Sequence, residues 1–324
     1  MSTAPQLQLV KPLKVAVRSD SLALVSLFVA LIAVSFAAIF IRFSEVEIGA
    51  NATVFNRFWI FAVLFGTIRA IAAARNRLAN PEPVTQPPLT LRHALLLVAV
   101  GVIATASLVL WAMSLTLTSV ANSVLLNNLT PIFASVGGWL FFGQCFDGRF
   151  ILGTGVALAG ALALGLGDFQ VADGSLGGDA LALLSAVFLA VYFLLVEKLR
   201  DRFDATAILL CRCTIGSVLL FPFIIGAGEP LFPTTASGWL AVIGLGAFCE
   251  GIGQRLLANS LNHFSSSFVC LFLLLEPLCS AILAWIIFAE KLSVVDGISF
   301  AVVLGGIYIA KSSQAAVKTA GESA

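Results

Sequence analysis

The chain has 324 residues, of which 60% are hydrophobic and only 11% are charged, and its formal net charge is +1. A soluble domain typically carries about a quarter of its residues as Asp, Glu, Lys and Arg. The composition therefore argues against a soluble domain. The near-zero net charge argues against a nucleic-acid-binding surface, which would be strongly basic. Spanning a bilayer takes roughly 20 apolar residues per helix, so the chain is long enough for about ten spans.

Ten apolar stretches follow one another along the chain. They predict helices, because only helices and closed barrels satisfy their backbone groups in lipid, and these runs are too long and too little alternating for barrel strands. The longest polar connection, Ala73 to Thr90, contains four prolines and is expected to be a loop. The expected spans are residues 21–41, 50–72, 91–113, 119–142, 149–167, 178–197, 205–226, 236–258, 264–288 and 294–312.

The two halves of the chain resemble each other. Pro131 and Pro277 each interrupt an apolar stretch and lie 146 residues apart (277 − 131). Because each half would hold five helices, an odd number, the second half must be inverted relative to the first. The same spacing relates Trp139 to Trp285, Phe142 to Phe288, Val156 to Val302, Leu158 to Leu304 and Gly160 to Gly306.

The expected fold class is therefore an all-α integral membrane protein with ten transmembrane helices in two inverted five-helix repeats. Residues 21–168 are expected to form the first repeat and residues 169–312 the second. Residues 1–20 and 313–324 would be cytoplasmic tails. Inverted repeats with a site near the membrane midplane are a recurring plan of secondary transporters.

Lysines and arginines predict the orientation, because they concentrate on the cytoplasmic side. With a cytoplasmic N-terminus, only Arg42, Lys291 and, if it lies near that end of its helix, Arg57 fall outside. Both termini are therefore expected in the cytoplasm. The inside would receive Lys11, Lys14, Arg18, Arg69, Arg75, Arg77, Arg92, Arg149, Lys198, Arg200, Arg202, Lys311 and Lys318.

A set of short motifs recurs in both halves. The first half contains Arg57-Phe58, Ala112-Met113, Ser119 to Ser123, Pro131, Gly143-Gln144 and Gly153 to Gly160. The second half contains Arg212-Cys213, Ala258, Ser265-Ser266-Ser267, Pro277, Ala289-Glu290 and Gly305-Gly306. In this order they resemble the EamA-type repeat of the drug/metabolite transporter superfamily, and within it the chain looks most like the YddG type of bacterial amino-acid exporter. Two departures are Gln144, where the repeat has glutamate, and Ala289, where it has glycine.

Three charged residues are expected to be buried within the membrane: Glu250 and Arg255 in the eighth span, and Glu276 in the ninth. A charge at a helix centre costs about 2.5–3.5 kcal/mol on insertion scales, so such residues usually face a cavity or a partner. Three interpretations stay open: an ion pair that joins helices, a site that binds both charges of a zwitterion, or a glutamate that carries a proton in exchange. Glu250 and Arg255 lie about 140° apart around an α-helix and are not expected to pair.

The two prolines each remove a backbone donor. Pro131 frees the carbonyl of Asn127, and Pro277 that of Leu273. A substrate ammonium, a side chain or a water would have to supply the missing hydrogen bond, or the kink only shapes the bundle and lets it bend. Asn127 and Thr130, unusually polar for a span, either line the same cavity or bond between helices.

Four further residues are candidates with two readings each. Trp111 and Tyr192 would form apolar walls of a binding site, or simply pack. Arg57 and Arg212, expected near opposite membrane faces, would fix helix ends or make a gating contact at each entrance. No catalytic residue, metal site or cofactor is expected, since the six cysteines and two histidines form no metal-like cluster.

The sequence thus predicts a secondary transporter, not an enzyme. The resemblance implies that it exports amino acids, aromatic ones among them, or similar small metabolites across the bacterial inner membrane by alternating access. The expected partners are the small-molecule substrate and membrane lipid. Proton coupling and a monomeric state are both compatible with the sequence. The alternative is a transporter of anionic metabolites such as nucleotide-sugars or sugar phosphates, which would favour several deep Lys or Arg residues.

Overall fold

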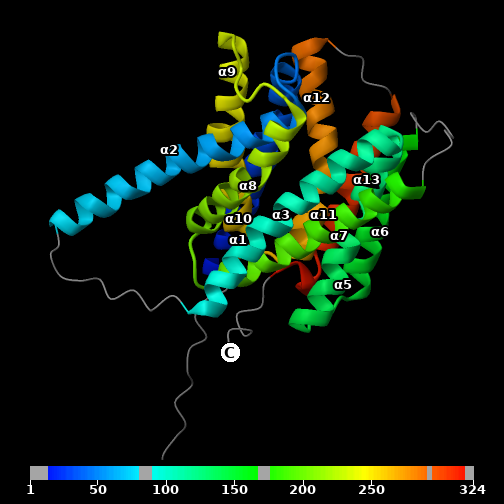
Figure 1. The fold of residues 1–324 in the computed structure, drawn as a ribbon. Helices are drawn as coiled ribbons and strands as arrows, with labels where there is room; N and C mark the ends of the chain where they lie inside the picture. Colours follow the sequence, from blue (N-terminus) through cyan, green and yellow to red (C-terminus); the bar gives the residue numbers. More distant parts are fainter. Residues whose placement is uncertain (1–13, 80–89, 167–175, 290–293, 318–324) are drawn as a thin grey trace, which may run out of the picture.

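The computed structural model describes residues 14–79, 90–166, 176–289 and 294–317 (Figure 1). The predicted proline-rich loop at residues 81–88, Glu290, Lys291 and the tail residues 1–13 and 318–324 lie outside the described residues. The helices are α1 (Lys14–Ser44), α2 (Ala50–Ala79), α3 (Leu91–Leu117), α4 (Val120–Asn127), α5 (Thr130–Phe142), α6 (Gly148–Leu166), α7 (Leu176–Leu199), α8 (Ala205–Ala227), α9 (Ala236–Ile243), η1 (Gly244–Gln254), α10 (Arg255–Ser260), α11 (Ser266–Phe272), η2 (Leu273–Leu275), α12 (Glu276–Phe288), α13 (Val294–Lys311) and η3 (Gln314–Ala316).

The predicted all-helical membrane fold is confirmed. Within the described ranges, nine helical segments are long and apolar enough to cross a bilayer, and a shorter apolar helix at Gly148–Ala163 supplies the tenth. Two helices run further than the apolar pattern indicates. The first begins at Lys14 instead of residue 21, and the second continues to Ala79, so that its end leaves the bundle (Figure 1). The Ala-rich stretch that extends α2 has high helix propensity, which does not require an apolar face.

Three of the predicted spans are not single helices. The fourth is divided into α4 and α5 around Asn128, and the ninth into α11, the 3-10 turn η2 and α12. Both breaks fall just before a proline, Pro131 or Pro277, which cannot donate to the preceding turn. The eighth span is continuous but widens into the π-helix η1 in its middle.

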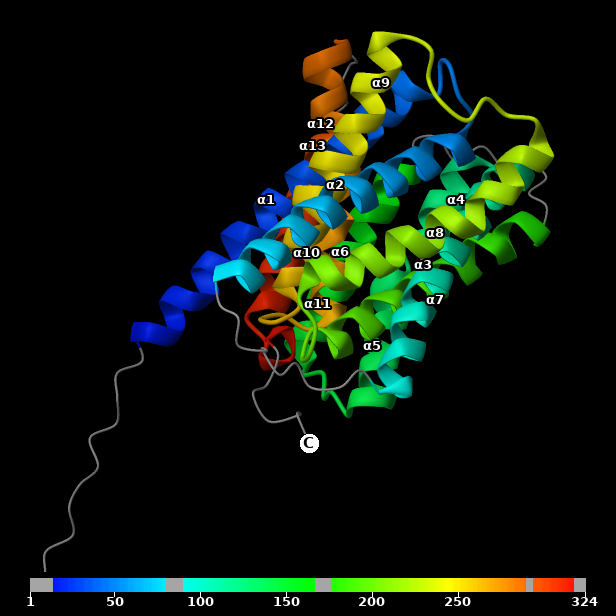
Figure 2. The ribbon, with the colours of Figure 1, turned by 60° about the vertical axis from the view of Figure 1, so that its left-hand side comes forward.

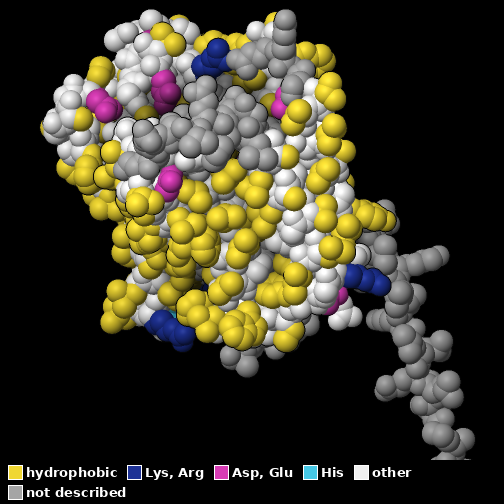
Figure 3. All heavy atoms as spheres, turned by 90° about the vertical axis from the view of Figure 1, so that its right-hand side faces the viewer, with side chains coloured by type: hydrophobic (Ala, Val, Ile, Leu, Met, Phe, Trp, Pro, Cys, Tyr) yellow, Lys and Arg dark blue, Asp and Glu magenta, His cyan; other side chains and the backbone are white. Residues whose placement is uncertain are grey.

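The outer surface of the bundle is largely apolar. Figure 3 shows hydrophobic side chains over the central band of one face, with charged side chains toward its ends. Many large apolar residues are exposed to the surroundings, among them Phe141, Trp139 and Ile151. A soluble protein rarely exposes so much contiguous apolar surface, whereas a membrane protein presents this surface to lipid. The chain is a multi-pass membrane protein.

Equivalent helices of the two halves run antiparallel. A Cβ atom placed on Gly153 of α6 would meet Gly306 and Ala310 of α13, whereas one on Gly160, two turns later, would meet Val303. Later residues of α6 therefore contact earlier residues of α13, so the two helices run antiparallel. In the same way, Gly216 of α8 packs on Phe58 of α2, while the earlier Leu210 packs on the later Gly66. The structure thus shows the inversion that the odd number of helices per half required.

The packing of the helices also repeats when the halves are exchanged. Helix α3 packs on α7 and α8, and its counterpart in the second half, formed by α9, η1 and α10, packs on α1 and α2. The pair α4–α5 packs on α7, as α12 packs on α1. Two of the contacts join equivalent helices: α2 packs on α8, and α6 packs on α13. The helices of each pair lie side by side in both ribbon views (Figure 2). A two-fold relation between the halves explains this pattern.

Helix ends at equivalent positions use the same devices. Ser119 caps α4 by accepting the Asn122 N–H at 3.1 Å, and Ser265 caps α11 by accepting the Phe268 N–H at 3.3 Å. At the other ends of these broken helices, Gly143 (φ 65°) and Ala289 (φ 55°) both adopt the left-handed conformation. That conformation suits glycine and strains alanine. The second half therefore keeps the turn geometry at position 289, although alanine stands there in place of glycine.

The α6–α13 contact offers a direct test of the packing. A Cβ on Gly306 would lie 2.6 Å from the Gly153 carbonyl oxygen, whereas one on the adjacent Gly305 would meet nothing within 4 Å. We expect Gly306→Ala to destabilise the protein by about 1–3 kcal/mol through overpacking. The matched control Gly305→Ala should stabilise the helix by about 0.5–1 kcal/mol. Thermal unfolding of the two variants in detergent measures both effects, and equal melting temperatures would contradict this packing.

Candidate functional site

A buried carboxylate lies in the middle of the bundle, on the π-helix. Glu250 belongs to η1 and is 0% exposed. Two glycines hold this helix close to α2, because a Cβ on Gly246 would collide with Ile60 and one on Gly251 with the ring of Phe65. Glycine has low α-helix propensity, and π-turns inside helices occur frequently at functional sites.

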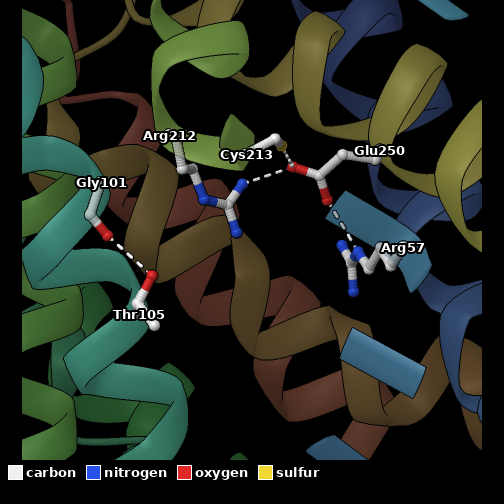
Figure 4. Close-up of polar contacts among 6 residues, drawn as sticks. All are labelled: Arg57, Gly101, Thr105, Arg212, Cys213 and Glu250. Carbon is white, nitrogen blue, oxygen red and sulfur yellow. Dashed lines mark hydrogen bonds and ion pairs between the residues drawn. The ribbon is translucent and has the colours of Figure 1, made fainter. Parts of the chain in front are cut away.

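Two arginines bind this carboxylate from two different helices. Arg57 of α2 donates from Nε to Oε2 of Glu250 at 2.7 Å, and Arg212 of α8 donates from a terminal nitrogen to Oε1 at 2.5 Å (Figure 4). The thiol of Cys213 lies 3.6 Å from the same Oε1. Both oxygens of Glu250 are therefore engaged, and the three charged residues, Arg57, Glu250 and Arg212, form what we call the central ion cluster.

Aromatic rings surround the buried end of the central ion cluster. The guanidinium carbon of Arg212 lies 5.1 Å from the ring centre of Phe58 and 5.0 Å from that of Tyr192. Such rings attract a cation through their negative faces. Arg212 is only 7% exposed, and its Nε has no hydrogen-bond partner. This arginine is therefore a buried structural cation.

Arg57 has a different environment from Arg212. Its side chain is 15% exposed, and only its Nε is bonded to Glu250. Within the described residues its two terminal nitrogens make no hydrogen bond, and Figure 4 shows the single contact from Arg57 to Glu250. These nitrogens are not among the fully buried atoms that lack a partner, so they keep some exposed surface.

Glu276 is the second carboxylate at the centre of the bundle. It begins α12, immediately after the 3-10 turn η2, and is partly buried. Its side chain makes no hydrogen bond to any described residue, yet it lies within electrostatic range of Arg57. The hydroxyl of Ser35 in α1 donates to the Glu276 backbone carbonyl at 3.4 Å. Arg57 and Glu276 therefore present opposite charges with unused hydrogen-bonding capacity in one region.

The carbonyls freed by the two prolines already have donors. The hydroxyl of Thr130 donates to the Asn127 carbonyl at 2.6 Å. The N–H of Glu276 donates to the Leu273 carbonyl within the 3-10 turn. The Asn127 carbonyl thus has a side-chain donor, one of the three kinds expected from the sequence. The Leu273 carbonyl has a backbone donor, which was not expected. Neither carbonyl is therefore without a donor.

The remaining candidates lie apart from the central ion cluster or contribute indirectly. Tyr192 contacts the central ion cluster through Arg212, but at 3% exposure it packs and does not form an open wall. Arg255 lies over the ring of Phe65, and no ion pair joins it to either glutamate in the described structure. On α3 and α4, three buried polar atoms have no hydrogen-bond partner: Trp111 Nε1, Asn127 Oδ1 and Asn122 Oδ1. Asn122 was not among the residues predicted from the sequence.

One prediction about the arginines is wrong. Arg57 and Arg212 were expected near opposite membrane faces, but both reach the same carboxylate. Their positions in the helices explain this, since each lies seven residues after its helix begins, at Ala50 or Ala205 (57 − 50 and 212 − 205). At about 1.5 Å per residue both lie roughly 10 Å along the helix, and a long side chain covers the rest. Counting residues from the start of each helix would therefore have placed the two arginines at a similar depth.

A second polar contact ties the α1–α2 turn to the α8–α9 connection. Glu47 accepts the backbone N–H groups of Thr234 and Thr235 at 2.9 and 3.0 Å, and also the Thr235 hydroxyl. These bonds, led by that of the Thr235 hydroxyl, lower the pKa of Glu47 to about 2. Nearby, Asn56 donates to the Leu231 carbonyl at 2.8 Å. The two halves are thus joined at this end of the bundle.

The central ion cluster predicts unequal effects for its two carboxylates. Glu250→Gln would leave two buried arginines facing each other without a counter-charge, and breaking a buried pair in this way costs about 3–5 kcal/mol. Glu276→Gln removes a carboxylate that makes no hydrogen bond, so it should leave stability unchanged or raised. Thermal unfolding in detergent compares them, and a Glu276→Gln variant as unstable as Glu250→Gln would refute the assignment.

The Glu47 contact predicts a pH dependence. A depressed folded-state pKa stabilises the folded protein fully above the ordinary pKa of 4.5, and that stabilisation is lost as pH falls toward 2. Glu47→Gln should therefore lower the melting temperature by a constant amount above pH 5, and the difference should shrink between pH 4.5 and pH 2. Glu45→Gln, on an exposed neighbour in the same turn, is the control. A difference independent of pH would contradict the contact.

Comparison with known proteins identifies the family. The profile of the EamA-like transporter family matches this chain twice, over residues 21–166 and 176–311. The uncharacterized transporter YdfC of Bacillus subtilis (strain 168) is 25% identical over 185 residues, which cover 56% of this chain and 60% of YdfC. An uncharacterized transporter of Archaeoglobus fulgidus is 24% identical over 208 residues, covering 62% of this chain and 70% of that protein.

A solved structure has the same fold. One protein crystal structure superposes with a TM-score of 0.72 over 90% of this chain and 98% of its own, at 20% sequence identity. That identity is low enough that the likeness concerns the fold alone. The two family matches together cover most of the chain and follow the two halves that the helix packing relates. The chain belongs to the EamA-like transporter family.

Proposed function

We propose that this protein carries zwitterionic amino acids, or similar small metabolites, across the membrane by alternating access. The observation that carries the proposal is that Arg57 and Glu276, of opposite charge, lie within electrostatic range of each other and make no ion pair with each other. The terminal nitrogens of Arg57 and the carboxylate of Glu276 are unbonded within the described residues and have opposite charge. An amino acid offers one group for each: a carboxylate for Arg57 and an ammonium for Glu276.

The central ion cluster supports this recognition by fixing Arg57. Glu250 accepts the Nε–H of Arg57, which leaves the two terminal nitrogens of the guanidinium without a hydrogen bond to Glu250. That end matches a carboxylate through two parallel hydrogen bonds, a geometry that a lysine does not provide. Glu250 therefore positions the arginine and does not itself bind the ammonium. Arg255, over Phe65, is likewise left out of the proposed site.

The charge count favours a zwitterion over an anionic metabolite. Arg57 and Arg212 are opposed by Glu250 and Glu276, so the four residues together carry no net charge. A phosphate or nucleotide-sugar would bring negative charge to a neutral site and would meet the Glu276 carboxylate. A zwitterion leaves the site neutral. An anionic-metabolite transporter is thus the less favoured alternative.

The broken helices support alternating access. The Asn127–Thr130 step and the η2 turn interrupt one helix in each half, at equivalent positions, and such breaks are places where a helix bends. We further propose an outward direction of transport, in the bacterial inner membrane with both termini cytoplasmic. The distribution of Lys and Arg in the sequence supports that orientation. This activity would place the protein with the YddG type of amino-acid exporter, the subgroup of the superfamily that its sequence resembles.

Counterflow of labelled amino acids into liposomes containing the purified protein tests the proposal. Because hydrogen bonds to charged groups contribute about 1.5–3 kcal/mol, Arg57→Lys and Glu276→Gln should each lower kcat/KM by about 10- to 100-fold. Arg69→Lys is the matched control, since Arg69 makes an exposed ion pair with Asp204. Absence of counterflow for every amino acid would overturn the proposal, as would full activity in both variants.

The same liposomes distinguish a coupling role for Glu276. If Glu276 also carries a proton, an imposed pH gradient accelerates wild-type transport and has no effect on Glu276→Gln. A gradient effect that persists in this variant would assign proton coupling to another group. Transport that ignores the gradient in both proteins would leave Glu276 with substrate binding alone.

A further inference from the structure

The chain folds back into the bundle after α13. Residues Ser313–Val317, which we call the return segment, contain the short helix η3 and run back to the start of α11. Within this segment Ser313 is 3% exposed and Ala316 is 0% exposed. Connecting segments usually run over the surface of a protein, so the burial of these two residues calls attention to what they contact.

The return segment is bonded to the first turn of α11 in the second half. The backbone N–H of Ser265 donates to the Ala316 carbonyl at 3.1 Å, and the hydroxyl of Ser265 donates to the Ala315 carbonyl at 2.8 Å. Phe264 and Val317 lie opposite each other as an isolated antiparallel bridge. Because Ser265 is the residue that caps α11, the return segment holds the start of that helix.

The same segment is bonded to the start of α6 in the first half. The hydroxyl of Ser313 donates to the carboxylate of Asp147, and this bond is the main reason that the pKa of Asp147 lies below its usual value. Asp147 also accepts the backbone N–H of Phe150 at 3.0 Å, in the first turn of α6. The return segment therefore joins two helix starts that come from different halves of the protein.

Helix α11 is enclosed along its whole length. All seven of its residues are buried, and the backbone N–H of Ser266 donates to Oε2 of Glu197 on α7 at 2.8 Å. The helix leads through the 3-10 turn η2 directly to Glu276. Contacts that hold the start of α11 thus also restrain the helix break beside the proposed substrate site.

The equivalent helix of the first half is less enclosed. Among Asn122–Asn127 of α4, only Ser123 is buried. Because the halves are inverted, α4 and α11 begin at opposite ends of the bundle. In carriers built from inverted repeats the two ends open in turn. The structure therefore has its more tightly closed end where α11 begins, and that is the end to which the return segment is bonded.

We propose that the return segment is a latch, which closes the α11 end of the bundle and releases when that end opens during transport. The inference rests on the alternating access proposed above, and in the proposed orientation this end is cytoplasmic. The latch is held by individual hydrogen bonds from Ser265 and Ser313, which suits reversible local opening. Helices α6 and α13, packed backbone to backbone at Gly153 and Gly306, provide its rigid support.

A reversible cross-link tests whether the latch has to release. Directly opposed residues of an antiparallel pair have Cα atoms roughly 4.5–5.5 Å apart, within the roughly 4.4–6.8 Å that a disulfide spans. The double variant Phe264→Cys, Val317→Cys should therefore cross-link under a mild oxidant. We expect counterflow in liposomes to stop on oxidation and to return on reduction. The two single variants, which retain the native cysteines, are the matched controls and should be insensitive to the oxidant.

A second variant loosens the latch. Ala316→Glu would bury an unpaired carboxylate at a fully buried position and so displace the segment. The native thiol of Cys270 on α11, which is 3% exposed, reports the opening. We expect a maleimide to alkylate Cys270 about tenfold faster than in the wild-type protein, as measured by mass spectrometry. Gln314→Glu, at an exposed position of η3, is the matched control and should leave the rate unchanged.

The two assays distinguish a failure of the latch from a failure of the proposed transport. Unchanged counterflow in the cross-linked protein would overturn the latch, as would cysteines at 264 and 317 that do not cross-link. Equal alkylation of Cys270 in Ala316→Glu and Gln314→Glu would also contradict it. Absence of counterflow in the reduced protein would instead count against the proposed function. In that case the latch still predicts slower alkylation of Cys270 after cross-linking and faster alkylation in Ala316→Glu.

Discussion

The buried ion cluster is the constraint on which the centre of this protein depends. Glu250 is fully buried in a membrane bundle, where an isolated carboxylate would be very costly. It is tolerated because Arg57 comes from the first half and Arg212 from the second, each within hydrogen-bonding distance. The cluster therefore holds the two halves together at the position where the helix packing is related by two-fold symmetry.

The cluster also separates two roles that look alike in the sequence. Two arginines and two glutamates lie in this region, but only Arg212 and Glu250 are buried. Arg212 lies between aromatic rings and Glu250 between arginines, so both are structural. Arg57 and Glu276 keep unused hydrogen-bonding groups, so the same electrostatics that stabilise the bundle leave one opposite pair for a ligand. The symmetric prolines and serine caps, by contrast, belong to both halves and shape the scaffold.

Much of this architecture follows from the sequence, because lipid leaves few alternatives. Continuous apolar runs required helices, the odd helix number per half required inversion, and the 146-residue spacing identified the paired prolines, caps and helix ends. The break around Asn128 was foreseeable from Pro131. Thr130, one residue earlier, even supplies the donor that the proline removes.

Other features could not be read from the sequence. The π-helix around Glu250 depends on glycines packed against Phe65 and Ile60, which are distant in sequence, and it makes α-helical angles between Glu250 and Arg255 unreliable. The meeting of Arg57 and Arg212 depends on long side chains crossing between helices. Glu197 was overlooked because it lies near the end of a span, where a charge looks ordinary, and only the fold buries it beside Ser266 and Ser267.

The central claim is that Arg57 and Glu276 recognise the two charges of one molecule. Competition in the counterflow assay tests it most directly, with three unlabelled competitors of one side chain: the amino acid, its analogue without the ammonium group, and its analogue without the carboxylate. The account predicts that only the zwitterion competes strongly with the wild-type protein. It also predicts that Glu276→Gln relaxes discrimination against the analogue without an ammonium group. Equal competition by all three molecules in the wild-type protein would contradict it.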